Sequence, residues 1–143
     1  MARSTPLEPV EGRQECLPPE EGAEYTAALS GSQLDPIFLY APTTPDDRMR
    51  SIAAQAKGFI YCVARKGVTG LDTAFGRSVT DYLTRARGAT ALPLAVGFGI
   101  KEKPDVNFLR GKAEIAVLGS EMIRVAREKG PAGVTAKLKA LRS

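Results

Sequence analysis

Three short turns that contain glycine, here called glycine corners, each follow directly after a short apolar run. They lie at residues 67–70, 97–99 and 119–120. Glycine allows a ligand to approach the backbone closely enough to accept a hydrogen bond from an N–H group. The third corner also opens a predicted helix, where free amides and the helix dipole favour an anion. One glycine alone would indicate only a turn, but the three together predict a phosphate site to which Ser120 donates its amide and its hydroxyl.

Side chains for catalysis are scarce. The chain has no histidine, which removes the commonest general base and the usual imidazole metal ligands. Cys16 and Cys62 are too few and too far apart for a disulfide framework or a zinc site, and Cys62 is interpreted as a small buried apolar residue. Lys66 has the chemistry to form a Schiff base, but anchoring of its loop or exposure to solvent is the preferred interpretation. We therefore assign no catalytic residue and no metal site.

The composition is typical of a soluble globular domain and gives no indication of binding to nucleic acid or to a membrane. The chain has 143 residues, of which 43% are hydrophobic and 25% charged, as in ordinary soluble globular domains. The net charge is +4, but the basic residues are mixed with acids and form no long run, so binding to nucleic acid is not indicated. No apolar run approaches the roughly 18–20 residues that span a bilayer. We expect no membrane association and a cytoplasmic location.

Strands and helices alternate along the chain, as expected for parallel βαβ units. Short apolar runs predict four buried strands, at residues 36–41, 59–64, 92–97 and 114–118. Capping residues, prolines and apolar periodicity predict the helices, at residues 19–29, 45–57, 78–89, 103–110, 120–129 and 134–141. A complete (β/α)₈ barrel needs about 250 residues, so this pattern corresponds to roughly half of one.

Some side chains can be assigned to faces of these elements. Hydroxyl caps are expected from the Thr43–Thr44 pair and from Ser78. The second of these helices should turn one apolar face to the sheet, made of Val79, Tyr82, Leu83 and Ala86. Residues 1–15 have two prolines and no apolar periodicity, so they are predicted to be a loose leader, and residues 16–143 to be the half-barrel.

Four segments carry a family resemblance. PIFLYAPTTPDDR (36–48), GFIYCVARKGVTG (58–70), LPLAVGFGI (92–100) and AVLGSEMIRV (116–125) resemble, in this order and spacing, the tryptophan synthase alpha subunit from the end of its fourth strand to its C-terminus. LPPEE at 17–21 is similar to the start of that family's fourth helix. The resemblance implies an α/β fold, the C-terminal half of a TIM (β/α)₈ barrel, with four parallel strands and flanking helices.

The resemblance also implies a function. Members of the family cleave indole-3-glycerol phosphate by a retro-aldol reaction, giving indole and glyceraldehyde 3-phosphate in tryptophan biosynthesis. Their partner is a pyridoxal-phosphate-dependent beta subunit, which receives the indole, and the alpha chain itself is expected to need no cofactor. The matching positions fall into three groups, which are the phosphate-binding Gly70, Gly99, Gly119 and Ser120, the pocket-lining Tyr61 and Phe98, and Thr69 in the loop that closes over the substrate.

Two departures from the family bear on activity. The family's catalytic acid and base are a glutamate on the second strand and an aspartate just after it, in a segment that this sequence does not include. Asp46 and Asp47 are interpreted as helix-start acids, and Glu114 and Glu121 match no catalytic motif. Because one positioned acid or base contributes about 10²- to 10⁴-fold, we expect almost no turnover from the chain alone. The second departure is Cys16, which replaces the aspartate that usually precedes LPPEE.

Several interpretations stay open at this point. Four open parallel strands would expose two strand edges and an apolar face, so the chain is expected either to close with a second copy as a homodimer or to be a poorly stable fragment. In function it is either part of the lyase or a non-enzymatic half-barrel that binds a phosphorylated ligand or a partner subunit. A different phosphate-binding activity assembled across a homodimer is a weaker third interpretation.

Overall fold

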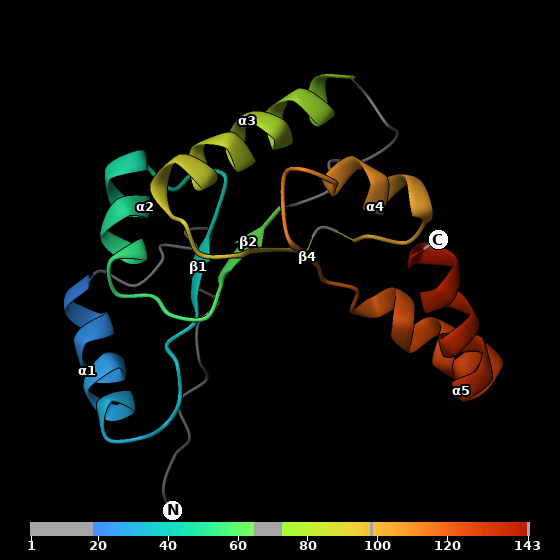
Figure 1. Ribbon diagram of the computed structural model, residues 1–143, viewed down its shortest axis with the longest axis horizontal. Coiled ribbons are helices and arrows are strands. Elements are labelled where there is room, and N and C mark those ends of the chain that lie inside the picture. Colours follow the sequence, from blue (N-terminus) through green and yellow to red (C-terminus); the bar gives the residue numbers. More distant parts are fainter. Residues whose placement is uncertain (1–18, 65–72, 98, 143) are drawn as a thin grey trace, which may run out of the picture.

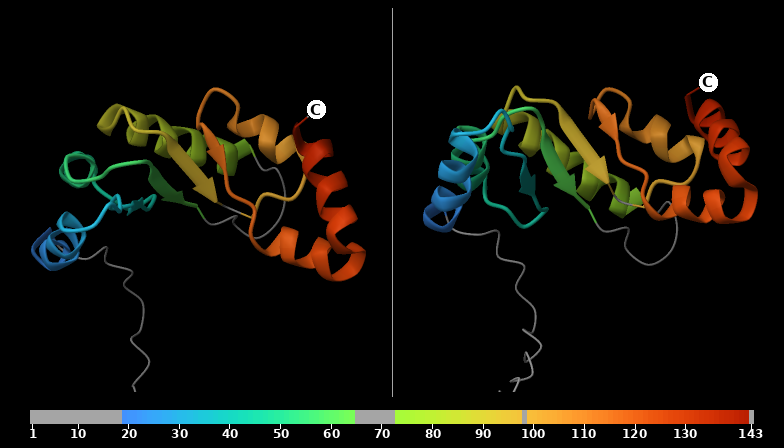
Figure 2. Two further views of the ribbon diagram at one scale, coloured as in Figure 1. Left: turned by 60° about the horizontal axis from the view of Figure 1, so that its bottom comes forward. Right: turned by 90° about the horizontal axis from the view of Figure 1, so that it is seen from below.

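One parallel sheet forms the centre of the molecule. The computed structural model describes residues 19–64, 73–97 and 99–142. Its strands follow the chain order β1-β2-β3-β4, and their bounds are Phe38–Tyr40, Ile60–Val63, Leu94–Gly97 and Ile115–Ala116. All three pairings are parallel, and Figure 2 shows the arrows pointing to one edge.

Five helices among the described residues surround this sheet on one side. They are α1 (Pro19–Ser30), α2 (Asp46–Ala53), α3 (Thr73–Ala89), α4 (Lys103–Leu109) and α5 (Ser120–Arg142). Figure 1 shows them following one another along an arc from α1 to α5, with the sheet on the concave side. This arrangement confirms the predicted fold class, because parallel strands inside an arc of helices form a partial (β/α) barrel.

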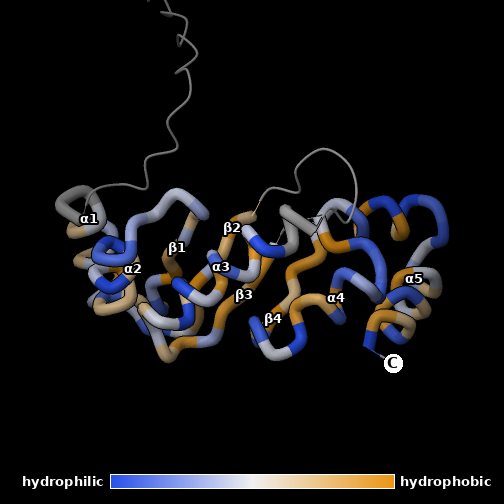
Figure 3. Tube along the Cα trace, turned by 90° about the horizontal axis from the view of Figure 1, so that it is seen from above, coloured by the Kyte–Doolittle hydropathy of each residue, from blue (hydrophilic) through white to orange (hydrophobic). Residues whose placement is uncertain are grey.

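The hydrophobic core lies between the helices and the convex side of the sheet. Tyr40, Cys62 and Val96 are fully buried there, and the register places Tyr40 beside Cys62 and Cys62 beside Val96. The apolar face predicted for α3 is confirmed, since Val79, Tyr82, Leu83 and Ala86 are all buried. Full burial of one large aliphatic side chain contributes about 1.5–3 kcal/mol. Figure 3 shows this apolar interior as the orange of the strands between the more hydrophilic helices.

Polar contacts fix the helices on the sheet. The Tyr82 hydroxyl donates to the Tyr40 carbonyl at 2.8 Å, and the Tyr40 hydroxyl donates to the Met49 carbonyl at 2.7 Å. Arg85 of α3 reaches the start of α2, where its Nε lies 2.6 Å from an oxygen of Asp46. The two tyrosine bonds satisfy buried polar groups that would otherwise cost about 1–3 kcal/mol each, and the exposed Arg85–Asp46 pair adds a contact between α2 and α3.

Two predicted helix caps are wrong. Thr44 does not cap α2, whose N-cap is Pro45 without a side-chain hydrogen bond, because the Thr44 hydroxyl accepts from the Ala41 amide at 3.0 Å in the preceding turn. Ser78 does not cap α3, because that helix begins at Thr73.

The element ends also differ from the prediction. The strands are shorter than their apolar runs, and α2 ends at Ala53 rather than at 57. The two C-terminal helices are joined at Gly130, which has φ 61° and ψ −168°. This left-handed conformation, which glycine adopts without strain, forms a kink in the gap between the predicted helices 120–129 and 134–141. The predicted leader at 1–15 and Cys16 lie outside the described residues.

Candidate functional site

The candidate residues lie on, or directly after, three neighbouring strands that end at one edge of the sheet. The Ala64 amide donates to the Gly97 carbonyl at 3.4 Å, and the Val117 amide donates to the Val96 carbonyl at 2.9 Å. These bonds hold the ends of β2, β3 and β4 level with one another. Two residues beyond Gly97 the chain reaches Gly99, and two residues beyond Val117 it reaches Gly119. The structure therefore brings the second and third glycine corners to neighbouring strand ends, where sites of parallel α/β proteins lie.

The first turn of α5 begins at this edge of the sheet. The Gly119 carbonyl accepts from the amides of Met122 and Ile123 at 3.0 and 3.2 Å, which makes Gly119 the N-cap of the helix. The first amides of a helix have no carbonyl partner within it and point along the positive end of its dipole. Both Gly119 and Ser120 are exposed, and an added Cβ at Gly119 would meet no atom within 4 Å. The turn is thus open to an approaching anion.

Gly99 needs to be glycine for conformational reasons. Its φ is +73°, a left-handed conformation that costs other residues about 1–2 kcal/mol. The residue is exposed and has open space around its Cα. Gly99 therefore turns the chain after β3 and leaves its backbone accessible on the same edge as α5.

Tyr61 lies on the concave face beside this edge. A Cβ built on Gly97 would overlap the Tyr61 hydroxyl oxygen and would lie 3.1 Å from Tyr61 Cζ and 3.6 Å from the Val117 Cβ. The phenol therefore leans across β3 toward the strand ends, and the missing side chain at Gly97 makes room for it. Because Cys62 is buried on the helix side, the two neighbours alternate as a strand requires. Tyr61 therefore lies on the concave face against the end of β3.

The buried Glu121, in the first turn of α5, forms ion pairs with two basic side chains. The Glu121 carboxylate accepts from Arg124 at 2.8 and 3.1 Å, and Lys137 lies 3.3 Å away. The hydrogen bonds from Arg124, followed by that from Lys137, lower the pKa of Glu121 from 4.5 to about 2. Since Lys137 lies beyond the kink at Gly130, this cluster joins the two parts of α5.

Sequence reasoning missed this cluster. The spacing of Glu121, Arg124 and Glu128 is typical of ion pairs along one helix, and that signal was available. The contribution of Lys137 was not, because it depends on the backbone direction after the kink.

The buried thiol and phenols take no part in this site. Burial raises the pKa of Cys62 from 9.0 to about 11 and that of Tyr40 from 10.0 to about 12, and it raises the pKa of Tyr82 still further. All three groups are therefore protonated at neutral pH, and they lie on the helix side of the sheet. The full burial of Cys62 confirms its interpretation as a small buried apolar residue.

Several carboxylates near the described strand and helix ends have structural partners. Asp46 pairs with Arg85. Glu114 accepts from Arg87 at 2.6 and 2.7 Å and from the Leu94 amide at 2.8 Å. Such groups fix elements in place. Among residues 19–64, 73–97 and 99–142, no group of three or more His, Cys, Asp or Glu side chains could hold a metal ion. Over the same residues no helix is long and apolar enough to cross a membrane.

Three of the predicted site residues fall outside the described part of the chain. They are Thr69, Gly70 and Phe98. Lys66 lies there as well. The structure therefore locates four members of the predicted site, which are Tyr61, Gly99, Gly119 and Ser120.

Comparisons with known proteins agree with this geometry. The family model for the tryptophan synthase alpha chain matches residues 15–142. A tryptophan synthase alpha chain of Desulforapulum autotrophicum is 55% identical over 118 residues, which cover 82% of this chain and 47% of that protein. One from Syntrophotalea carbinolica is 53% identical over 126 residues, covering 88% and 50%. The chain thus spans about half the length of these curated relatives.

Solved structures give the same result. A tryptophan synthase complex from Pyrococcus furiosus superposes with a TM-score of 0.74 at 27% identity, covering 88% of this chain and 51% of that one. A structure of the α₂β₂ complex from the same organism also gives 0.74, at 31% identity and 88% and 52% coverage. The match over nearly the whole described chain, together with glycine corners on adjoining strand ends, shows that this chain belongs to the tryptophan synthase alpha chain family.

Proposed function

We propose that this chain binds the phosphate end of indole-3-glycerol phosphate, as the C-terminal half of a lyase that releases indole in tryptophan biosynthesis. One observation carries the proposal. The open first turn of α5, at Gly119 and Ser120, follows the end of β4, and the exposed Gly99 follows the end of the neighbouring strand β3. Backbone amides at a helix N-terminus bind phosphate through hydrogen bonds and the helix dipole, and barrel phosphate sites form after the last two strands.

Each site residue receives a role in this proposal. The amides of Gly99, Gly119 and Ser120 hold the phosphate, and the Ser120 hydroxyl adds a donor. Tyr61 contacts the indole or glycerol part of the ligand from the concave face. The remaining assignments, which rest on the family motif alone, are Gly70 for the phosphate, Phe98 for the pocket wall and Thr69 for the closing loop.

The bond cleavage itself needs groups beyond those described. A retro-aldol reaction breaks one carbon–carbon bond, removes a proton from a hydroxyl group and adds a proton to the leaving carbon. The carboxylates described above are held by arginines or by backbone amides rather than aimed into the concave face. We therefore propose that the 143-residue chain binds the ligand and that turnover requires a second half-barrel carrying an acid and a base.

Partners and location belong to the same proposal. One of the similar structures is an α₂β₂ complex, which supports a tryptophan synthase beta subunit as partner. A second half-barrel against the concave face would complete the eight strands of the fold. We propose residues 16–143 as the domain, which the family match over 15–142 supports, and a cytoplasmic location, where isolated thiols stay reduced.

The proposed phosphate binding can be tested by thermal unfolding. We expect sn-glycerol 3-phosphate to stabilise the parent by about 2.7 kcal/mol at roughly 100 times its Kd, seen as a rise in Tm. Gly119→Ala should abolish this rise, because the added methyl group stands where the anion approaches. The variant should still fold, since that methyl meets nothing within 4 Å and alanine at an N-cap costs about 1 kcal/mol.

Gly88→Ala is the matched control, because it adds the same methyl group within α3 where nothing lies within 4 Å. It should keep the full response to the ligand. An equal rise in Tm for Gly119→Ala and the parent would show that the anion binds elsewhere.

A second assay separates the lyase interpretation from that of a non-enzymatic binding module. Indole release from indole-3-glycerol phosphate is measured for the chain alone, with a beta subunit, and with a separately expressed N-terminal half of a relative. We expect release only when the N-terminal half is present. Turnover by the chain alone would contradict the proposal, and binding without turnover in every mixture would favour the non-enzymatic module.

A further inference from the structure

A carboxylate lies in the turn of α5 whose amides are proposed to hold the phosphate. Glu121 directly follows Ser120 in the first turn of this helix, and only 7% of it is exposed. Hydrogen bonds from Arg124 hold its pKa down at about 2, so it is ionised at neutral pH. A negative side chain near a helix N-terminus stabilises the helix, but it repels an anion that binds at the same amides. Phosphate binding therefore requires that the charge of Glu121 is balanced.

Arg124 alone does not balance this charge. It lies between two carboxylates, because its guanidinium donates to Glu121 at 2.8 and 3.1 Å and to Glu128 at 2.6 Å. One positive charge is thus shared by two negative charges. Lys137 supplies the second positive charge, with its Nζ 3.3 Å from a Glu121 oxygen. These two acids and two bases carry no net charge, and removal of Lys137 would leave one negative charge in the cluster.

The kink at Gly130 brings Lys137 to the start of the helix. Residues 121 and 137 would lie about 24 Å apart along a straight helix. Gly130 has φ 61° and ψ −168°, and Figure 2 shows the second part of α5, in red, running at an angle to the first part. The Lys137 side chain is 25% exposed and that of Glu121 is 6% exposed. Solvent and salt therefore screen this pair less than a pair at the open surface.

We propose that Lys137 is a positioning residue of the phosphate site, which neutralises Glu121 so that a phosphate dianion can bind at the first turn of α5. The inference rests on the proposed function, in which the amides of Gly119 and Ser120 hold the phosphate. Lys137 acts through Glu121 and without touching the ligand. The ligand class that depends on it is a phosphate monoester, because a neutral ligand is not repelled by the carboxylate.

Two charge variants separate this role from a structural one. The Kd for sn-glycerol 3-phosphate is measured by isothermal titration calorimetry at low salt. Lys137→Met keeps the apolar part of the side chain and should weaken binding about two- to fivefold, the effect of one charge near a helix end. Glu121→Gln should tighten binding by a similar factor. Both variants break the same ion pair, so a purely structural role would change the affinity in the same direction in both.

Further variants test whether charge is the cause. Lys137→Arg keeps the positive charge and should bind like the parent. Glu121→Gln combined with Lys137→Met restores a neutral cluster and should also bind like the parent. In 1 M salt, where the screening length falls to about 3 Å, the difference between the two single variants should shrink.

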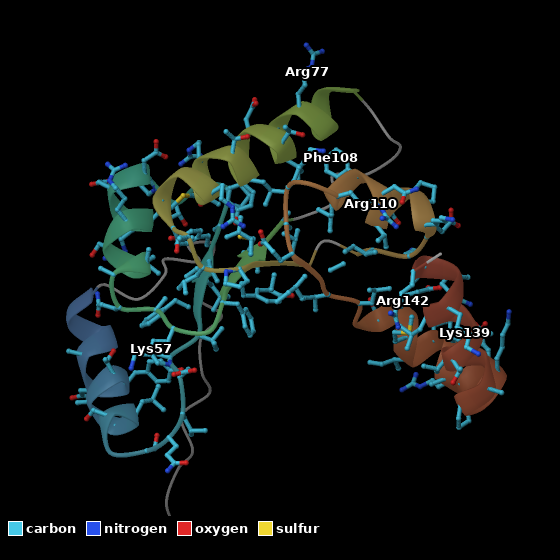
Figure 4. All side chains as sticks on the ribbon, in the orientation of Figure 1. Lys57, Arg77, Phe108, Arg110, Lys139 and Arg142 are labelled. Atoms are coloured by element: carbon cyan, nitrogen blue, oxygen red, sulfur yellow. The ribbon has the colours of Figure 1, made fainter. Side chains whose placement is uncertain are left out.

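Lys139→Met is the matched control. Lys139 is an exposed lysine on the second part of α5 (Figure 4), and residues two positions apart on a helix point to different sides. Loss of this charge should leave the Kd nearly unchanged. A loss of affinity as large as that of Lys137→Met would show that only the net charge of the protein matters, and it would overturn the role of Lys137.

The outcomes distinguish this inference from the proposed function. If Gly119→Ala abolishes binding but the two single charge variants do not change the Kd in opposite directions, the role of Lys137 is wrong and the phosphate site stands. If Gly119→Ala binds like the parent, the anion lies elsewhere and both proposals fail. Should Lys137→Met not fold, Glu121→Gln decides alone. Tighter binding then supports the role of Lys137, and equal or weaker binding overturns it.

Discussion

Gly97→Ala tests whether Tyr61 occupies the space above β3. The new Cβ would overlap the Tyr61 hydroxyl oxygen and would come within 3.1 Å of Cζ of the same ring. Extra methyl groups that force packed side chains aside cost about 1–3 kcal/mol. We therefore expect Gly97→Ala to lower the free energy of unfolding by an amount in this range.

The cost should depend on the Tyr61 hydroxyl. Tyr61→Phe removes the oxygen that the methyl group overlaps and leaves only the 3.1 Å contact with Cζ. In the Tyr61→Phe background the penalty of Gly97→Ala should therefore fall by about 0.5 kcal/mol or more, the size of coupling found between residues in contact. Urea unfolding of the parent, both single variants and the double variant, at one protein concentration, gives this coupling energy.

Gly88→Ala is the control for a glycine with free space. It lies in α3, and its added Cβ meets nothing within 4 Å, so the better helix propensity of alanine should raise stability by up to about 1 kcal/mol. If Gly97→Ala were as stable as the parent, or if its penalty were the same with and without the Tyr61 hydroxyl, the placement of Tyr61 would be wrong.

Two predictions concern pH. Arg124 and Lys137 lower the pKa of Glu121 to about 2, so the carboxylate stabilises the fold above its ordinary pKa of 4.5 and this contribution is lost as pH falls from 4.5 through 2. Urea midpoints between about pH 6 and about pH 2.5 should therefore fall more steeply for the parent than for Glu121→Gln, and parallel curves would refute the ion cluster. Burial, opposed by a hydrogen bond with Tyr82, raises the pKa of Cys62 to about 11, so its contribution is complete below pH 9 and is lost as pH rises from 9 through 11. Cys62→Ala should lose less stability than the parent across that alkaline range, and an identical slope would show that the thiol is not buried.

The order of the elements could be predicted because local signals and packing agree. The apolar runs 36–41, 59–64, 92–97 and 114–118 each contain a strand. Burial on both faces was wrong for the edge strands β1 and β4, where Leu39 and Ile115 are 45% and 39% exposed. The face of α3 followed from its 3.6-residue period, and the kink at Gly130 lies in the gap between the predicted helices 120–129 and 134–141.

Boundaries and long-range partners could not be predicted in the same way. Thr44 has the side chain of a helix cap, but its hydroxyl bonds to Ala41 instead, and both arrangements are local and similar in energy. The contact of Tyr61 with Gly97, and that of Glu121 with Lys137, join residues far apart in the sequence. Their existence depends on strand register and on the kink in α5, which no local pattern specifies.

Backbone amide NMR with sn-glycerol 3-phosphate tests the central claim most directly. The amides of Gly99, Gly119 and Ser120 are proposed to surround one phosphate group. Their resonances should shift together during a titration and give a single Kd, while the amide of Gly88 stays unchanged. Shifts confined to other residues, or different Kd values for Gly99 and for the first turn of α5, would contradict a shared phosphate site at these strand ends.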